Sequence, residues 1–237
     1  MPVSTEKATL TETVYGELRA ELLRGELAPG AKLRISEIAA QRGVSPSVLR
    51  EALTRLAEQG LVVAMPQRGF AVAELSIEAL LDLTRARTII ESAALRESIA
   101  DGDLAWEADV IAAHYRLRHT PLNNADGHVN LEWADAHRHF HHTLLAGGTS
   151  SRLTALADGL RDCSELYMYW SRELAHDDHR DAAAEHEEIT ELTLARDAGR
   201  ATQALAAHIE RTTEALVRYA SAAGESASHQ SHKNAPA

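Results

Sequence analysis

Apolar residues recur every three to four positions in three early segments of the chain, as on the buried face of an α-helix. This spacing predicts helices over residues 11–25, 35–41 and 46–59. Gly43 suits a tight turn between the second and third helices, because glycine tolerates a positive φ. Ser45 is a good N-cap for the third helix, with Pro46 at the first helical position. The second and third helices are therefore expected to form a helix-turn-helix.

Two short apolar runs follow, over residues 61–65 and 70–73, and predict a β-hairpin whose turn carries Arg68. Three helices followed by such a hairpin make a winged helix-turn-helix, whose third helix can lie in the major groove of DNA. Residues 41–68 contain four arginines and two glutamates, whereas residues 1–76 as a whole carry nine basic and nine acidic side chains. The predicted reading surface is thus locally basic, which favours binding to double-stranded DNA.

The chain beyond residue 76 shows only helical periodicity. Breaks between the apolar stripes predict six helices, over residues 77–100, 103–119, 129–146, 150–174, 180–196 and 200–222. Such a set is typical of an antiparallel helical bundle. The polar tail over residues 224–237 is rich in small side chains, which predicts disorder. We therefore expect a mainly α protein, with a winged helix-turn-helix domain over residues 1–75 and an all-helical domain over residues 76–223.

Composition restricts the class of protein. The net charge of −11 arises beyond residue 76, and all 13 histidines lie beyond residue 113. Cys163 is the single cysteine, so an internal disulfide is excluded. No stretch approaches the ~20 continuous apolar residues of a membrane span, and the N-terminus lacks the order of a signal peptide. These features predict a cytoplasmic protein that is not embedded in a membrane.

Four histidines are predicted to face the interior of the bundle. His137 and His141 lie on the side of their helix that also carries Trp133, and their i, i+4 spacing lets two imidazoles share one metal ion. His186 and His208 fall within the apolar stripes of two further helices. Four imidazoles could close a site for Zn, Ni, Cu or Fe. For each histidine alone, a core position with a hydrogen bond to a neighbour is the competing interpretation.

The run over residues 27–72, LAPGAKLRISEIAAQRGVSPSVLREALTRLAEQGLVVAMPQRGFAV, resembles the DNA-binding domain of the GntR family of winged-helix transcription regulators. In that family, the start of the third helix and the tip of the wing contact DNA. By position, the resemblance implies DNA contacts from Ser45, Ser47, Arg50 and Arg68. The family usually has an arginine where this chain has Pro46, so a different operator core is expected.

The C-terminal runs LLDLTRARTIIESAALRESIA, HFHHTLLAGGTSSRL, EHEEIT and AHIE resemble the ligand-binding domain of the FadR-type branch of the same family. The count of six helices is similar to its vanillate-regulator-like group. Many such domains hold a divalent metal with one Asp and three His, which the resemblance places at His141, His186 and His208, with His137 at the Asp position. A nitrogen ligand in place of the carboxylate favours Zn, Ni or Cu over Mn or Mg.

The resemblance also matches an Arg and a Glu on the first helix of that domain, here Arg87 and Glu91. An arginine directed into a bundle cavity suits a small carboxylate effector, because its planar fork can bind both oxygens. A surface ion pair of i, i+4 spacing, worth only ~0.2–0.5 kcal/mol, is the alternative.

Three functions are compatible with these features. The first is a ligand-responsive transcription regulator, expected to act as a repressor. A winged helix reads only a few base pairs, so a homodimer on a pseudo-palindromic operator is expected. The second is a metal-dependent enzyme that uses the histidines with Glu165 or Glu187 as a base, although the winged helix would then have no role. The third is a structural DNA-binding protein, which buried polar residues in the bundle argue against.

Overall fold

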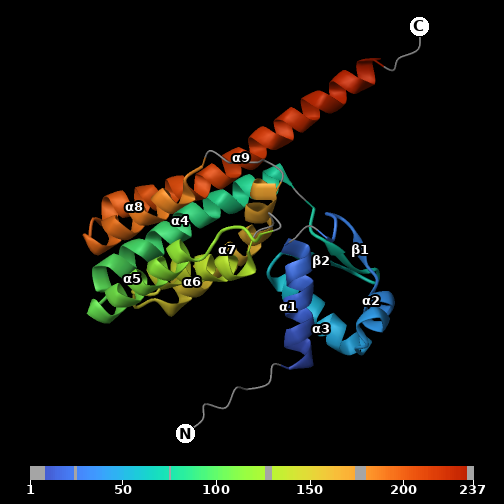
Figure 1. Ribbon diagram of the computed structural model, residues 1–237, viewed down its shortest axis with the longest axis horizontal. Helices are drawn as coiled ribbons and strands as arrows, with labels where there is room; N and C mark the ends of the chain where they lie inside the picture. Colours follow the sequence, from blue (N-terminus) through green and yellow to red (C-terminus); the bar gives the residue numbers. More distant parts are fainter. Residues whose placement is uncertain (1–8, 24–25, 75, 126–129, 174–179, 234–237) are drawn as a thin grey trace. The chain divides into compact units, whose positions relative to one another are not determined.

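The computed structural model describes residues 9–23, 26–74, 76–125, 130–173 and 180–233. The chain divides into two compact units, Met1–Leu75 and Ser76–Ala237 (Figure 1). The first is a small winged helix-turn-helix, and the second consists of helices. Within these described ranges, none of the helices combines the length and the apolar character needed to cross a bilayer.

Over residues 9–23 and 26–74, the N-terminal unit consists of three helices and a three-stranded antiparallel sheet. The helices are α1 (Leu10–Leu23), α2 (Ile35–Arg42) and α3 (Pro46–Glu58), and the strands are β1 (Lys32–Leu33), β2 (Val62–Met65) and β3 (Gly69–Val72). The strand order is β1-β3-β2, with Val63 opposite Ala71 in the hairpin and Lys32 opposite Ala71 on the other side. Strand β1 was not predicted from the sequence, because two residues are too short to show an alternating pattern.

Local backbone chemistry shapes the turn before α3. Gly43 ends α2 with a φ of 64°, in the left-handed region that its sequence position predicted. The Ser45 hydroxyl then accepts a hydrogen bond from the backbone N–H of Val48, as an N-cap does. Leu49, Leu53 and other apolar side chains of α3 are fully buried, where α3 packs against α1. The helix is therefore held firmly by one face while its opposite face is exposed.

The C-terminal unit contains the six predicted helices. They are α4 (Ile77–Asp101), α5 (Leu104–His119), α6 (Leu131–Leu145), α7 (Ser151–Glu173), α8 (Ala182–Leu194) and α9 (Ala198–Lys233). Helix α4 packs against α7 and α9, and α5 packs against α6 and α8 (Figure 1). Side-chain oxygens cap the N-termini of several of these helices, from Ser76, Asp103, Asn130 and Asp181. The starts predicted for these four helices from breaks between apolar stripes, at residues 77, 103, 129 and 180, lie within two residues of the observed ones.

The last helix is longer than expected. Helix α9 continues through Gly224 to Lys233, whereas its end was predicted near residue 222. A single glycine in a helix costs only about 1 kcal/mol relative to alanine, and no proline occurs before Pro236 to stop the helix. Tyr219, near the predicted end of this helix, is 37% exposed. The last turns of α9 project beyond the other helices of this unit (Figure 1).

Candidate functional site

The four residues predicted to contact DNA are all exposed in the N-terminal unit. Arg50 lies on the solvent side of α3, and Arg68 lies in the turn of the wing. Ser45 and Ser47 stand at the start of α3 with their hydroxyl oxygens 2.8 Å apart. The winged helix therefore presents a helix start and a wing tip to solvent, as insertion into a groove requires.

Two of the four arginines that made this segment basic have other partners. Arg42 donates hydrogen bonds to Glu17 at 2.8 Å and to Glu21 at 2.6 Å, and thus ties α2 to α1. The guanidinium of Arg55 lies over the ring of Tyr15, 4.4 Å from its centroid. The local positive charge available to DNA is accordingly smaller than the arginine count suggested, which places more weight on Arg50.

We expect Arg50→Ala to weaken operator binding by ~1–3 kcal/mol if Arg50 contacts a base, since an arginine fork supplies that much discrimination. The measurement is fluorescence anisotropy with operator DNA at fixed salt. Arg116→Ala, which removes an exposed arginine of α5 in the other unit, is the matched control. Equal affinities for both variants and the wild type would remove Arg50 from the reading surface.

In the C-terminal unit, the four predicted histidines come together. His137 and His141 come from α6, His186 from α8 and His208 from α9, and one nitrogen of each lies within 4.8 Å of the others. All four side chains are buried. The Nε2 atoms of His137 and His141 are 3.2 Å apart. Ligands at 2.0–2.1 Å from a tetrahedral zinc ion stand about 3.3 Å from one another, so this pair fits a shared metal.

The electrostatics of the cluster also fit a metal ion, which binds neutral imidazole. Burial, reinforced by the charge of Arg161 and by the other imidazoles, lowers the pKa of His141 well below its ordinary value. Burial lowers the pKa of His208 to about 4, although its hydrogen bond to Glu185 acts in the opposite direction. The Nδ1 atom of His141 is buried with no hydrogen-bond partner, a cost that an all-protein core rarely carries.

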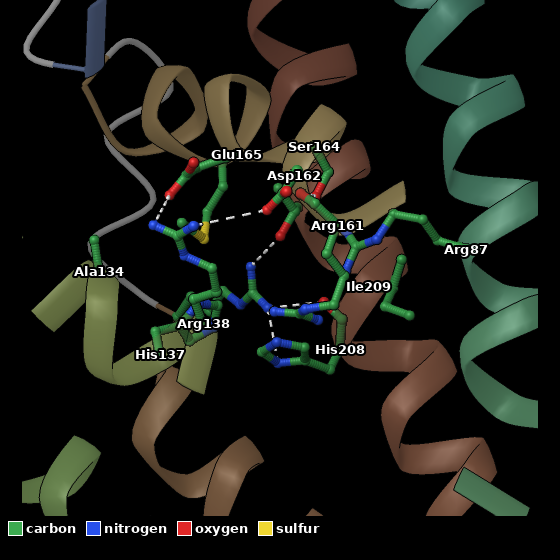
Figure 2. A pocket seen from close by; sticks show the side chains of 13 residues that line it. Arg87, Ala134, His137, Arg138, Arg161, Asp162, Ser164, Glu165, His208 and Ile209 are labelled. Atoms are coloured by element: carbon green, nitrogen blue, oxygen red, sulfur yellow. Dashed lines mark hydrogen bonds and ion pairs between the residues drawn. The ribbon is translucent and has the colours of Figure 1, made fainter. Parts of the chain in front are cut away.

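A pocket beside the cluster is lined by four arginines (Figure 2). They are Arg87, Arg138, Arg161 and Arg180. His137 and His208 line the same pocket, so the histidine cluster borders it directly. An anion in this pocket would meet guanidinium groups and the histidine cluster at once.

Arg87 is not part of a surface ion pair. Its Nε donates to Glu91 at 2.6 Å, and both side chains are largely buried. Glu91 also accepts a hydrogen bond from Arg161 Nη1 at 3.0 Å. Burial raises the pKa of Glu91, but the charges and hydrogen bonds of Arg87 and Arg161 outweigh it, and the pKa lies below its ordinary value. One carboxylate thus balances two buried guanidinium groups, which leaves this wall of the pocket positive.

Arg161 is one of the site residues that the sequence did not single out. Its side chain is only 8% exposed, and its buried Nε has no hydrogen-bond partner. Ala157 and Ser164 are buried on α7, four residues before and three residues after Arg161, so all three lie on one face of the helix. This spacing is the signal in the sequence that could have predicted a buried Arg161.

The two glutamates nominated as enzymatic bases are differently placed. Glu165 is buried and lines the pocket, 3.9 Å from Arg138. Glu187 pairs with Arg118 at 2.9 Å, in a half-exposed ion pair at the surface. Glu165 thus belongs to the charged wall of the pocket, and Glu187 to an exterior contact.

Comparison with known proteins decides the family. Residues 10–72 match the model of bacterial regulatory proteins of the gntR family, and residues 82–211 match the FCD domain. The chain belongs to the GntR family. The helical unit of this GntR regulator is therefore the FadR-type, ligand-binding FCD domain, and both resemblances noted from the sequence are confirmed.

Relatives match the GntR regulator along most of its length. The uncharacterized HTH-type transcriptional regulator BphR of Paraburkholderia xenovorans (strain LB400) is 33% identical, over 92% of this chain and 89% of its own. The HTH-type transcriptional repressor GlaR of Escherichia coli (strain K12) is 32% identical, over 82% of this chain and 90% of its own. These relatives are transcriptional regulators, and the enzyme hypothesis is not retained.

Solved structures share the fold of the GntR regulator. E. coli McbR/YncC superposes with a TM-score of 0.70 at 21% identity, over 90% of this chain and 99% of that chain. A protein described as a transcriptional regulator GntR from Rhodococcus sp. RHA1 superposes with a TM-score of 0.66 at 26% identity, over 88% of this chain and 98% of that chain. The mainly α architecture with an N-terminal winged helix is thereby confirmed.

Proposed function

We propose that this GntR regulator is a repressor whose affinity for its operator is set by a small carboxylate bound in the FCD domain beside a transition metal. The observation that supports this proposal is the shared border of the arginine-lined pocket and the histidine cluster, through His137 and His208. The name of the relative GlaR, a transcriptional repressor, supports the direction of regulation.

His137, His141, His186 and His208 are the residues that would hold the metal, for which we propose Zn or Ni. When bound, such an ion would supply positive charge that attracts a carboxylate, and it would accept a carboxylate oxygen by expanding its coordination beyond the four imidazoles. Neutral imidazoles give electron pairs to the metal without carrying charge, so the four histidines do not offset the positive charge of the ion. An anionic effector would therefore be favoured by the electrostatics of the cluster.

Arg161 and Arg87 are the proposed anchors for the carboxylate. Arg87 gives its Nε to Glu91, whereas Arg161 gives only Nη1 to that carboxylate and keeps an Nε without a partner. Binding an anion there would satisfy a buried donor and offset the unbalanced positive charge, and both effects favour the bound state.

We further propose that the regulator acts in the cytoplasm as a homodimer on a pseudo-palindromic operator of double-stranded DNA, through Ser45, Ser47, Arg50 and Arg68. Effector binding would then change the spacing of the two winged helices. Leu75, in the linker expected to carry this change, lies outside the described residues.

The test begins with selection of bound DNA sequences, which yields an operator. Operator affinity is then measured with zinc and a panel of mono- and dicarboxylates that includes acetate, succinate and benzoate, and the mass of the complex gives the number of chains. We expect at least one carboxylate to lower operator affinity of the wild type roughly 10-fold, within the usual range of allosteric coupling. Arg161→Gln should abolish that response.

Arg152→Gln is the matched control, because Arg152 lies exposed on the same helix α7. Its response should equal that of the wild type. A carboxylate response that persists in Arg161→Gln would show that the effector binds elsewhere, and one chain per operator would overturn the homodimer.

A further inference from the structure

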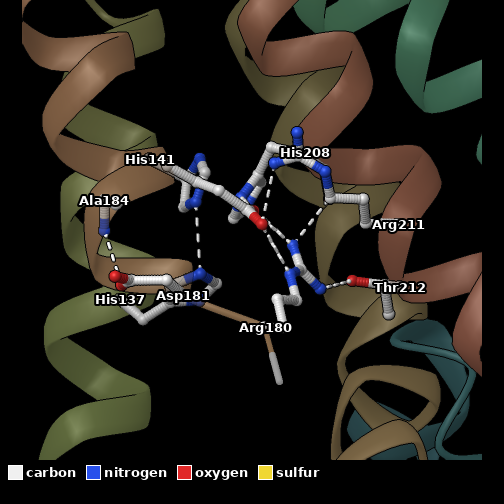
Figure 3. Close-up of polar contacts among 9 residues, drawn as sticks. His137, His141, Arg180, Asp181, Ala184, His208, Arg211 and Thr212 are labelled. Carbon is white, nitrogen blue, oxygen red and sulfur yellow. Dashed lines mark hydrogen bonds and ion pairs between the residues drawn. The ribbon is translucent and has the colours of Figure 1, made fainter. Parts of the chain in front are cut away.

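Glu185, on α8 next to His186, has a buried side chain that is surrounded by donors. Figure 3 shows three of these donors, Arg180, His208 and Arg211, close to one another. Its Oε2 accepts a hydrogen bond from His208 Nδ1 at 2.7 Å and another from Arg180 Nη2 at 2.7 Å. Its Oε1 lies 2.8 Å from Arg211 Nη1. Two guanidinium groups thus face this carboxylate, an arrangement that favours its ionised form.

A carboxylate at Nδ1 decides the protonation of the His208 ring. Two groups compete for Nδ1: Glu185 Oε2 at 2.7 Å, which can only accept, and Arg180 Nη2 at 3.3 Å, which can only donate. The shorter contact favours a neutral imidazole with its hydrogen on Nδ1 and its lone pair on Nε2. That is the tautomer a metal ligand needs when it binds through Nε2, and the same hydrogen bond fixes the orientation of the ring.

Arg180 restrains the other side of this arrangement. Its guanidinium donates to Glu185, to the backbone carbonyl of His208 at 2.8 Å and to Thr212 at 2.8 Å. Arg180, which lies just before the start of α8, therefore links Glu185 of α8 to His208 and Thr212 of α9. The carboxylate cannot turn away from His208 without losing several charge-assisted hydrogen bonds.

We propose that Glu185 is a positioning residue for the metal site: it selects the Nδ1–H tautomer of His208 and presents Nε2 to the other three histidines, with Arg180 and Arg211 as its supports. The inference rests on the proposed metal-binding function and adds to it a residue that contacts the ligand rather than the metal. Such outer contacts usually change metal affinity 10- to 100-fold.

The experiment measures zinc affinity at neutral pH by competition with a chromophoric chelator, using the full chain. Glu185→Gln should bind zinc roughly 10- to 100-fold more weakly than the wild type. Glu185→Asp keeps a charge beside Arg180 and Arg211 but is one methylene too short for His208, so it should fold and show a comparable loss. Glu188→Gln, which removes an exposed carboxylate on the same helix, should bind zinc as the wild type does.

A second measurement reads the tautomer directly, without metal. Long-range proton–nitrogen correlation spectra of the imidazoles should show His208 protonated on Nδ1 in the wild type and a mixture of tautomers in Glu185→Gln. Zinc affinity equal to the wild type in either folded Glu185 variant, or an Nε2–H tautomer of His208 in the wild type, would overturn the positioning role. Failure of the wild type to bind zinc would instead overturn the proposed metal site itself.

Discussion

The double variant His141→Ala, His208→Ala is expected to lose metal uptake altogether while keeping operator binding. It removes two of four nitrogen donors from two different helices, and His137 and His186 alone cannot close a tetrahedral site. Apparent free energies of structural zinc binding are about 10–16 kcal/mol, so losing half of the ligands removes most of that interaction. The winged helix-turn-helix belongs to a separate compact unit and carries none of these residues.

Metal content per chain after dialysis is the primary measurement, with operator affinity and effector response measured on the same preparations. The matched control is His139→Ala, His142→Ala, since both of these histidines lie exposed on α6. The control should retain about one metal ion per chain, as a single site implies. A normal effector response in the cluster variant would mean that regulation does not depend on the metal.

Glu91→Ala is expected to destabilise the FCD domain by about 3–5 kcal/mol, the usual cost of breaking a buried ion pair. Glu91 is fully buried between Arg87 and Arg161, and its removal leaves two guanidinium groups without their shared carboxylate. Urea unfolding of the full chain, followed by the signal of the helical domain, measures the loss. Asp82→Ala removes an exposed acid from the same helix α4 and should change stability little.

The ion pairs of Glu91 with Arg87 and Arg161 also predict that the stability of the domain depends on pH. The pKa of Glu91 is lowered in the folded protein, so its contribution to stability is complete above the unfolded-state pKa of about 4.3. It is lost as the pH falls through the lower, folded-state pKa. Wild type and Glu91→Ala should therefore differ most near neutral pH and converge under acid conditions. A constant difference across that range would contradict an ionised Glu91.

Local patterns were sufficient for most of the helices and for the turn of the helix-turn-helix. Gly43 with its positive φ and Ser45 as the N-cap act within a few residues, so their roles can be read from neighbours in sequence. Strand β1 and the continuation of α9 escaped prediction for the opposite reason. A two-residue strand exists only because β3 pairs with it, and α9 runs on to Lys233 through residues whose composition gives no helical stripe.

The sequence by itself determined which side of α6 is buried, and therefore that His137 and His141 face inward together. Periodicity carries that information because one helical turn places i and i+4 on the same face. Only the tertiary structure brought Arg161 to Glu91, seventy positions away, and His208 to Glu185, 23 positions away. A helical stripe shows that a side chain will be buried. Its partner depends on which helices pack together and on how they are shifted along their axes relative to one another. The charge of the pocket and the tautomer of the fourth histidine were decided at that level.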